Sequence, residues 1–199
     1  MFLTVLNATS NDLLRASNPL MVSNAYAVHQ WLTQQQDTTR VDSGLLYHVE
    51  ILQDSVNMYI QSIVPFNVSN VPSTGFKVHQ ENKPITAKCT EGERICFQVR
   101  ALPQKCAQRK RYSLYNTDEQ IKWFKHKCAN HGLQVDACEV CSKEPIYFTK
   151  KGKHVTENAC IYAGVATVRD ADAFNTMLQK GFGHGKAFGA GLFMTSATL

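Results

Sequence analysis

Hydrophobic and polar positions alternate in several short segments, as expected of strands that bury one face. The clearest is 94–101, where Phe97 and Val99 share a parity with other apolar residues and Arg100 lies on the opposite one. Residues 158–168 are apolar on both parities, which is typical of a central strand. The remaining expected strands lie at about 2–8, 44–51, 56–64, 133–141, 145–150 and 190–196.

Three other segments, at about 24–36, 118–131 and 171–180, have apolar residues at helical spacing instead. Common capping residues precede each one, and Lys180-Gly181 ends the last. The expected caps are Ser23 or Asn24, Thr117, and Asp170. The apolar stripes are Val28, Trp31 and Leu32; Ile121, Phe124 and Cys128; and Phe174, Met177 and Leu178.

The order of these elements predicts the fold class. The second half follows a β-α-β-β-α-β order with one extra strand, and the first half opens with the same β-α-β-β. We therefore expect an α+β protein with two tandem ferredoxin-like (RRM-like) domains, at 1–90 and 91–199. Because this fold hosts many functions, the function has to come from particular residues.

Composition limits the class of protein. A chain of 199 residues with 44% hydrophobic residues suits one large or two small globular domains. The N-terminus lacks the basic start of a signal peptide, and no apolar run is long enough to span a membrane. Seven cysteines without a repeating spacing favour a reducing cytoplasm and mostly free thiols.

Charge is unevenly distributed along the chain. Residues 1–93 have five Lys or Arg against eight Asp or Glu, whereas 94–153 have thirteen against five. A basic middle segment indicates a local anionic partner, although a solvated charged face would give the same pattern. The cations near the start of this segment are Arg94, Arg100, Lys105, Arg109, Lys110 and Arg111, followed by Lys122, Lys125 and Lys127. Such a segment could contact the phosphates of structured RNA.

Tyr26 and His29 are the first candidates for chemistry. They lie three residues apart in the first predicted helix, so their side chains are neighbours beside its apolar stripe. A histidine can transfer protons near neutral pH, and a tyrosine can orient a phosphate. The alternative is a structural pair at the edge of a packed helix.

A glycine-rich stretch before the last strand is the second candidate. Five glycines in eleven residues allow positive φ and close approach of a partner to the backbone, and a lysine adds charge. A flexible connection is the alternative reading. The residues of interest are Gly181, Gly183, His184, Gly185, Lys186, Gly189 and Gly191.

A zinc site is a weaker possibility in the cysteine-rich segment. Cys128 and His131 are separated by two residues, as are Cys138 and Cys141, and these ligand types suit tetrahedral zinc. Cys128 also completes an apolar helix stripe, which favours buried thiols instead.

Taken together, these motifs resemble the CasE (Cse3) family of CRISPR type I-E proteins over nearly the whole chain. The most specific piece is the glycine-rich stretch from Gly181 to Phe193. The other matching stretches are Tyr26-x-x-His29 with Trp31-Leu32, Leu45 to Glu50, Phe97 to Pro103, Arg109 to Arg111, Gln120 to Phe124, and Gly164 to Val168.

The resemblance implies an endoribonuclease that needs no cofactor or metal. It would bind the CRISPR repeat hairpin, cleave the precursor RNA at the 3′ base of the stem through the 2′-OH, and stay bound to the mature crRNA. His29 would transfer a proton and Tyr26 would orient the phosphate. Some relatives place a lysine where Gln34 stands, so Lys186 or Arg40 would supply charge instead.

The resemblance also implies partners, namely the backbone, large and small subunits of the Cascade complex. Target DNA would be reached only through that complex, and no membrane is involved. Two alternatives stay open: a catalytically inactive subunit that binds the crRNA hairpin, and a zinc-dependent nucleic-acid module.

Overall fold

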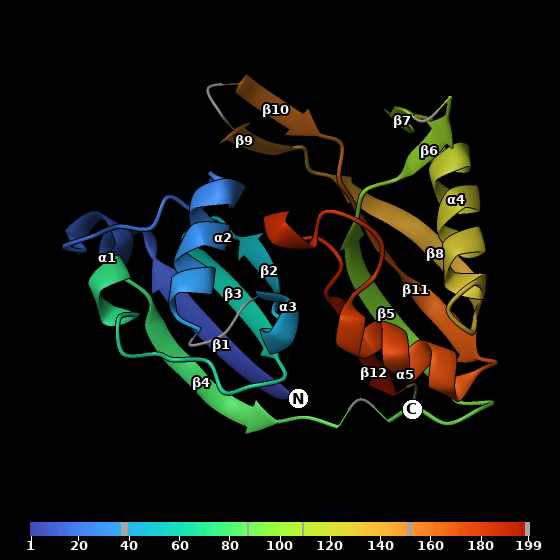
Figure 1. Cartoon of the computed structure of the whole chain (residues 1–199), viewed down its shortest axis with the longest axis horizontal. Coiled ribbons are helices and arrows are strands. Elements are labelled where there is room, and N and C mark those ends of the chain that lie inside the picture. The colour runs from blue at the N-terminus through green and yellow to red at the C-terminus, as the bar shows by residue number, and fades with distance from the viewer. Residues whose placement is uncertain (37–39, 87, 109, 151–152, 198–199) are drawn as a thin grey trace.

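The computed structural model describes residues 1–36, 40–86, 88–108, 110–150 and 153–197. It contains two four-stranded antiparallel sheets that lie side by side (Figure 1), with strand orders β2-β3-β1-β4 and β12-β5-β11-β8. In each sheet the first strand along the chain lies between the third and the fourth, which is the ferredoxin-like arrangement. The predicted fold class is therefore confirmed.

The first sheet consists of β1 (Phe2–Thr9), β2 (Leu46–Ile51), β3 (Ser55–Ser62) and β4 (Lys77–Pro84). Helix α2 (Ala25–Gln34) buries Val28, Trp31 and Leu32 against Leu6, Met58 and Ile60 of the sheet. The short helices are α1 (Ser10–Arg15), α3 (Arg40–Ser43) and the 3-10 turn η1 (Pro72–Thr74).

The second sheet consists of β5 (Arg94–Ala101), β8 (Leu133–Lys143), β11 (Cys160–Val168) and β12 (Phe193–Ala197). Helices α4 (Thr117–Ala129) and α5 (Ala171–Lys180) cover one face of it. The alternation predicted for β5 is observed, because Ile95, Phe97 and Val99 are buried beneath these helices. The opposite face of β5 stays polar.

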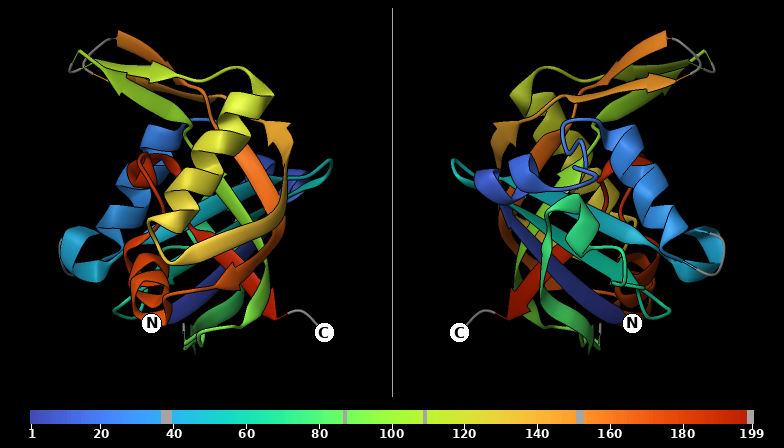
Figure 2. Two further views of the ribbon diagram at one scale, coloured as in Figure 1. Left: turned by 90° about the vertical axis from the view of Figure 1, so that its right-hand side faces the viewer. Right: turned by 90° about the vertical axis from the view of Figure 1, so that its left-hand side faces the viewer.

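Two hairpins extend beyond the sheets and lie at the same end of the molecule (Figure 2). One pairs β6 (Gln104–Ala107) with β7 (Lys110–Ser113), and the other pairs β9 (Ile146–Lys150) with β10 (Lys153–Glu157). The Gln104 amide donates to the Glu157 carboxylate at 2.8 Å and so connects the hairpins.

Several details differ from the sequence-based expectations. Asn116, not Thr117, caps α4, because its side chain accepts from the backbone N–H groups of residues 118 and 119. Gln120 is buried in α4, while Ile121 is only partly buried. The Gln120 side chain donates to the Leu114 carbonyl at 2.8 Å, so this buried amide, outside the predicted apolar stripe, has a hydrogen-bond partner.

The two sheet units meet through an apolar cluster and a few long-range hydrogen bonds. Leu102, Ile146, Phe148, Ala159 and Ala190 form the buried centre of this cluster. The Gln61 amide also donates across the junction to the Leu178 carbonyl at 2.8 Å. Within the described part of the chain, no helix has the length and apolar character needed to cross a membrane.

Candidate functional site

Helix α2, which carries Tyr26 and His29, lies against strand β9 of the second unit. Asn24 begins the helix by accepting from the backbone N–H groups of Tyr26 and Ala27 at 3.1 and 3.3 Å. Tyr26 and His29 are both half-buried, at the edge of the buried face as the spacing predicts. Tyr26 packs against the apolar cluster between the units, so its position depends on both of them.

His29 is held within its own helix. The Thr33 hydroxyl donates to the His29 carbonyl at 2.8 Å and lies 3.5 Å from the His29 Nδ1 atom. These contacts restrict the ring while leaving it partly exposed. A partly exposed imidazole at this place has the access that proton transfer to a bound molecule requires.

The glycine loop, residues 181–191, packs against α2 through the 3-10 turn η2 (Lys186–Phe188) (Figure 1). All five glycines of the loop have positive φ. At Gly189 the requirement is also steric, because a Cβ atom would lie 3.0 Å from the Tyr47 ring. The loop is closed by backbone hydrogen bonds from Phe182 to Gly191 and from Gly191 to Arg100, both 2.8 Å long. It is therefore a defined structure and not a flexible connection.

Tyr47 joins the helix to the loop. Its side chain comes from β2, is 1% exposed, and its hydroxyl lies 3.2 Å from the Ala25 carbonyl and 3.0 Å from the Ala187 carbonyl. One residue thus fixes the start of α2 to η2 in the other unit. Within the second unit, Phe148 of β9 stacks on Phe188 of η2 with ring centres 4.0 Å apart, which holds the loop against the β9–β10 hairpin. Neither contact was predicted from the sequence, since each joins residues that lie far apart along the chain.

The basic segment after β5 forms the β6–β7 hairpin instead of an irregular loop. Lys105, Lys110 and Arg111 are all exposed on it, and Tyr112 is 45% exposed among them. Arg109 lies outside the described residues. An exposed hairpin with cations and an aromatic ring can contact a phosphate backbone and stack on a base.

His184 and Lys186 of the loop are near the cations of the second unit. Partial burial lowers the pKa of His184, and the charges of Arg111, Lys127 and Lys186 lower it further. Arg111 of the hairpin and Lys186 of the loop therefore act on the same ring. The Lys186 side chain itself lies over Gly181 beside Leu46 of the first unit, so Lys186 borders the junction between the units.

Arg94 and Arg100 lie apart from the hairpin and the glycine loop. Both lie on the face of β5 opposite to the helices, where Arg94 approaches the Asp136 carboxylate at 3.8 Å. Arg100 is largely buried, with Nη2 donating to the Glu144 carbonyl at 3.1 Å and lying 3.4 Å from its carboxylate. The Arg40 side chain lies outside the described residues.

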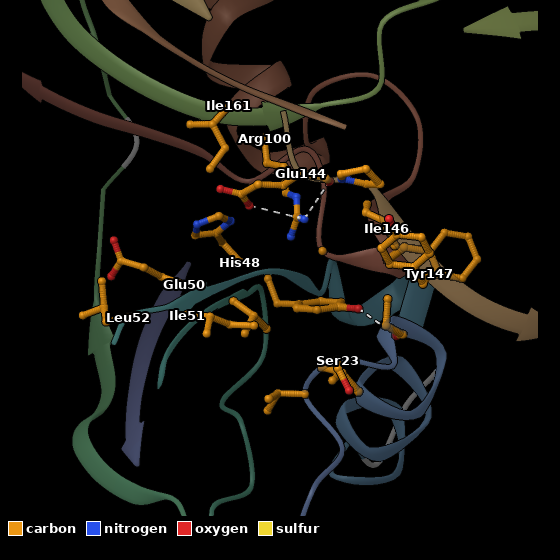
Figure 3. A pocket seen from close by; sticks show the side chains of 18 of the residues that line it. Ser23, His48, Glu50, Ile51, Leu52, Arg100, Glu144, Ile146, Tyr147 and Ile161 are labelled. Carbon is orange, nitrogen blue, oxygen red and sulfur yellow. Dashed lines mark hydrogen bonds and ion pairs between the residues drawn. The ribbon is translucent and has the colours of Figure 1, made fainter. Parts of the chain in front are cut away.

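Arg100 instead lines a cleft of about 540 Å³ between the units. Figure 3 shows Arg100 and Glu144 pointing toward each other beside His48, with Tyr147 at one side. Burial lowers the pKa of His48 and the nearby Arg100 charge adds to this, while Glu144 and Glu50 act in the opposite sense. Tyr47 and Gly189 also line the cleft, so it borders the back of the contact between α2 and the loop.

The four candidate zinc ligands are not brought together. Cys128 is buried in the core, and Cys138 packs partly against that core from β8. Cys141 is exposed and points with Glu139 to the other face of the strand. Among the described residues, no three His, Cys, Asp or Glu side chains are placed to share a metal ion.

Comparison with known proteins agrees with this architecture. The family model described as "CRISPR associated protein" matches residues 1–196. The "CRISPR system Cascade subunit CasE" of Escherichia coli (strain K12) is 28% identical over 186 residues, covering 84% of this chain and 89% of that protein.

Solved structures are similar over nearly the whole chain. One is the CRISPR endoribonuclease Cse3 bound to a 19-nucleotide RNA, with a TM-score of 0.86, 22% identity, and coverage of 98% and 100% of the two chains. Another is Thermus thermophilus Cse3 bound to an RNA that represents a pre-cleavage complex, with a TM-score of 0.81, 19% identity and the same coverage. At these identities the structures establish the fold.

Proposed function

The chain belongs to the CRISPR-associated protein family, as its resemblance to CasE and Cse3 predicts, and on that premise we propose that it processes CRISPR RNA. It binds the repeat hairpin, cleaves the precursor at the 3′ base of the stem and keeps the mature crRNA. The observation that carries this proposal is the attachment of α2, with Tyr26 and His29, to the glycine loop through Tyr47.

Binding and cleavage are assigned to different elements. The exposed cations of the β6–β7 hairpin contact the phosphates of the stem, and the glycine loop lets the backbone approach the RNA closely. Tyr26 and His29 then lie beside the phosphate that is cleaved. Retention of the product fits a subunit of a type I-E Cascade complex, in which this chain holds the hairpin end and contacts a backbone subunit.

The reaction is an internal transesterification. The ribose 2′-oxygen forms a bond to the adjacent phosphorus while the bond from phosphorus to the 5′-oxygen breaks. The 2′-OH loses its proton and the leaving 5′-oxygen gains one, which gives a 2′,3′-cyclic phosphate and a 5′-OH. His29 transfers one of these protons and Tyr26 orients the phosphate. Because the nucleophile belongs to the substrate, the mechanism requires no metal-activated water.

The test is cleavage of the cognate repeat RNA in EDTA by wild type and by His29→Ala. We expect one cut at the stem base by wild type, and a rate at least about a thousandfold lower in the variant, since a general acid or base contributes on this scale. Hairpin affinity should stay within about twofold, because His29 adds little to phosphate binding. A 2′-deoxy nucleotide at the scissile position should abolish cutting in the same way.

His79→Ala is the matched control, because His79 is an exposed histidine on β4 of the same unit. It should cleave like wild type. Tight binding without any cutting by wild type would identify an inactive hairpin-binding subunit instead. Cutting that depends on an added divalent metal would refute the mechanism.

A further inference from the structure

Helix α2 carries a threonine one turn after His29. Tyr26, His29 and Thr33 follow one another at intervals of three and four residues, so their side chains lie on one stripe of the helix. All three are half-buried, whereas Gln30 and Gln34 beside them are exposed. Thr33 therefore lies next to the proposed catalytic pair, on the same side of α2.

The Thr33 hydroxyl faces two atoms of His29. Its oxygen lies 2.8 Å from the His29 carbonyl oxygen and 3.5 Å from the ring atom Nδ1. A carbonyl can only accept, so the single hydroxyl proton is directed to it over the shorter of the two distances. The Thr33 oxygen then has only lone pairs left for the Nδ1 atom.

This arrangement distinguishes the two neutral forms of the histidine ring. A neutral imidazole has one N–H, at either Nδ1 or Nε2, and the hydrogen bond made by one nitrogen determines which form is present. With the lone pairs of Thr33 facing it, Nδ1 of His29 is stabilised when it carries the proton, because a second lone pair at that place would be repelled. Nε2, which the ring directs away from Thr33, then carries the lone pair.

We propose that Thr33 is a positioning residue that holds neutral His29 with its proton on Nδ1, so that proton transfer in RNA cleavage takes place at Nε2. The inference rests on the proposed function and deepens it, since it names the atom of His29 that reacts. Thr33 acts only through His29.

The same nitrogen reacts whichever proton His29 transfers. As a base, the Nε2 lone pair takes the proton of the 2′-OH, and Nδ1 keeps its own proton in the imidazolium. As an acid, the imidazolium gives its Nε2 proton to the leaving 5′-oxygen and returns to the neutral form with a proton on Nδ1. Thr33 stabilises the neutral form that reacts in the first case and the neutral form that is produced in the second.

The first measurement is a ¹⁵N NMR spectrum of the imidazole rings in the full chain without RNA, at a pH where His29 is neutral. His29→Ala identifies the signals of His29. For wild type we expect the pattern of a ring protonated on Nδ1. Thr33→Val replaces the hydroxyl with a methyl group of similar size and should weaken this pattern, whereas Thr33→Ser keeps the hydroxyl and should retain it.

The second measurement is single-turnover cleavage of the cognate repeat RNA. Thr33→Val should slow it about tenfold, because the reacting nitrogen is less often ready for proton transfer, while hairpin affinity stays within about twofold. Thr33→Ser should cleave within about twofold of wild type, since the hydroxyl is kept. Thr176→Val is the matched control, because Thr176 is an exposed threonine on α5, and it should cleave like wild type.

Failure of the inference and failure of the proposed function give different results. A wild-type spectrum with the neutral His29 proton on Nε2 would overturn the inference, whatever the rate of cleavage. So would equal cleavage by wild type and Thr33→Val, or a serine variant as slow as the valine variant. If wild type binds the hairpin but never cuts it, the proposed function fails and the role of Nε2 fails with it, while the spectra still show whether Thr33 fixes the ring.

Discussion

The two sheet units share one strand order but carry different kinds of residue. The first unit supplies Tyr26 and His29 on its single long helix and has an excess of acidic residues. The second supplies the basic hairpin and the glycine loop. Neither unit alone has both the residues proposed for proton transfer and the exposed cations of the hairpin. The proposed function therefore depends on the junction, where Tyr47 of the first unit contacts the Ala187 carbonyl of the second.

The largest effect is expected when the cations of the second unit, which are proposed to bind RNA, are removed. Replacing Lys105, Lys110 and Arg111 with alanine should weaken hairpin binding about a hundredfold at moderate salt, because phosphate contacts dominate affinity. The cleavage rate of the saturated complex should stay within about threefold, as the first unit is unchanged. Binding titrations and single-turnover cleavage would be measured on the same samples.

The control for that experiment removes cations from the connecting region. Lys83 and Lys88 are exposed at the end of the first unit and after it. Replacing both with alanine should change affinity by less than about threefold. An equal loss of affinity in this variant would show that overall charge, and not the hairpin, governs binding.

Sequence patterns predicted the elements that bury one regular face. The β5 alternation and the edge position of His29 on α2 follow from local spacing, and both are observed. The β4 strand was not predicted because most of its side chains are exposed, so it has no apolar period. The same reason explains why the β6–β7 hairpin resembled a loop.

Contacts between residues far apart in the sequence limited how much of the candidate site could be predicted. Tyr47 contacts Ala187, which lies 140 residues later, and nothing in its own strand indicates this partner. Arg100 has the pattern of an exposed cation, but Glu144 and the first unit cover it. Tertiary packing therefore decides which cations are exposed, whereas the positive φ of the glycines and the edge position of Tyr26 and His29 on α2 follow from the sequence pattern.

A comparison of two glycines addresses the contact between the units. Gly189→Ala should cost about 2–4 kcal/mol, because it combines a strained positive φ with a clash against the Tyr47 ring. Gly183→Ala has a similar φ but open space, so it should cost only about 1–2 kcal/mol. Denaturant unfolding gives both values. Equal costs would mean that the Tyr47 contact adds nothing to stability.

Tyr47→Phe asks whether the junction also positions Tyr26 and His29, the proposed catalytic pair. The variant loses the hydrogen bonds to Ala25 and Ala187 but keeps the ring. We expect single-turnover cleavage to slow about tenfold, with hairpin affinity within about twofold, because a small displacement of α2 affects proton transfer more than phosphate contacts. A shift of the rate profile with pH would distinguish positioning of His29 from a general loss of folded protein.

Tyr59→Phe is the matched control for that change. The Tyr59 hydroxyl donates to the Glu50 carboxylate at 3.3 Å within the first sheet, away from the glycine loop. Its loss should cost about 1 kcal/mol of stability, similar to the Tyr47 variant, without slowing cleavage. If both variants cleave equally slowly, stability and not position is responsible.

The smallest expected effect concerns two histidines of the first unit that differ in exposure. His29 is partly exposed, whereas His48 is 4% exposed in the cleft beside Arg100. Burial lowers the pKa of His48 in the folded protein below its ordinary value of about 6.5. The unfolded chain therefore binds more protons in this range, and the stability that His48 provides is complete above about pH 6.5 and is lost as the pH falls toward the folded pKa.

Replacing His48 with glutamine removes this proton uptake. The free energy of unfolding of the variant should therefore fall less than that of wild type between about pH 7 and 5, as measured by urea titrations at each pH. His79→Gln, an exposed histidine in the same unit, should follow wild type. If the free energy of unfolding depended on pH equally in wild type and the His48 variant, burial in the cleft would not lower the pKa of His48. The buried and the exposed histidines of this unit would then share one environment, contrary to the difference in burial between them.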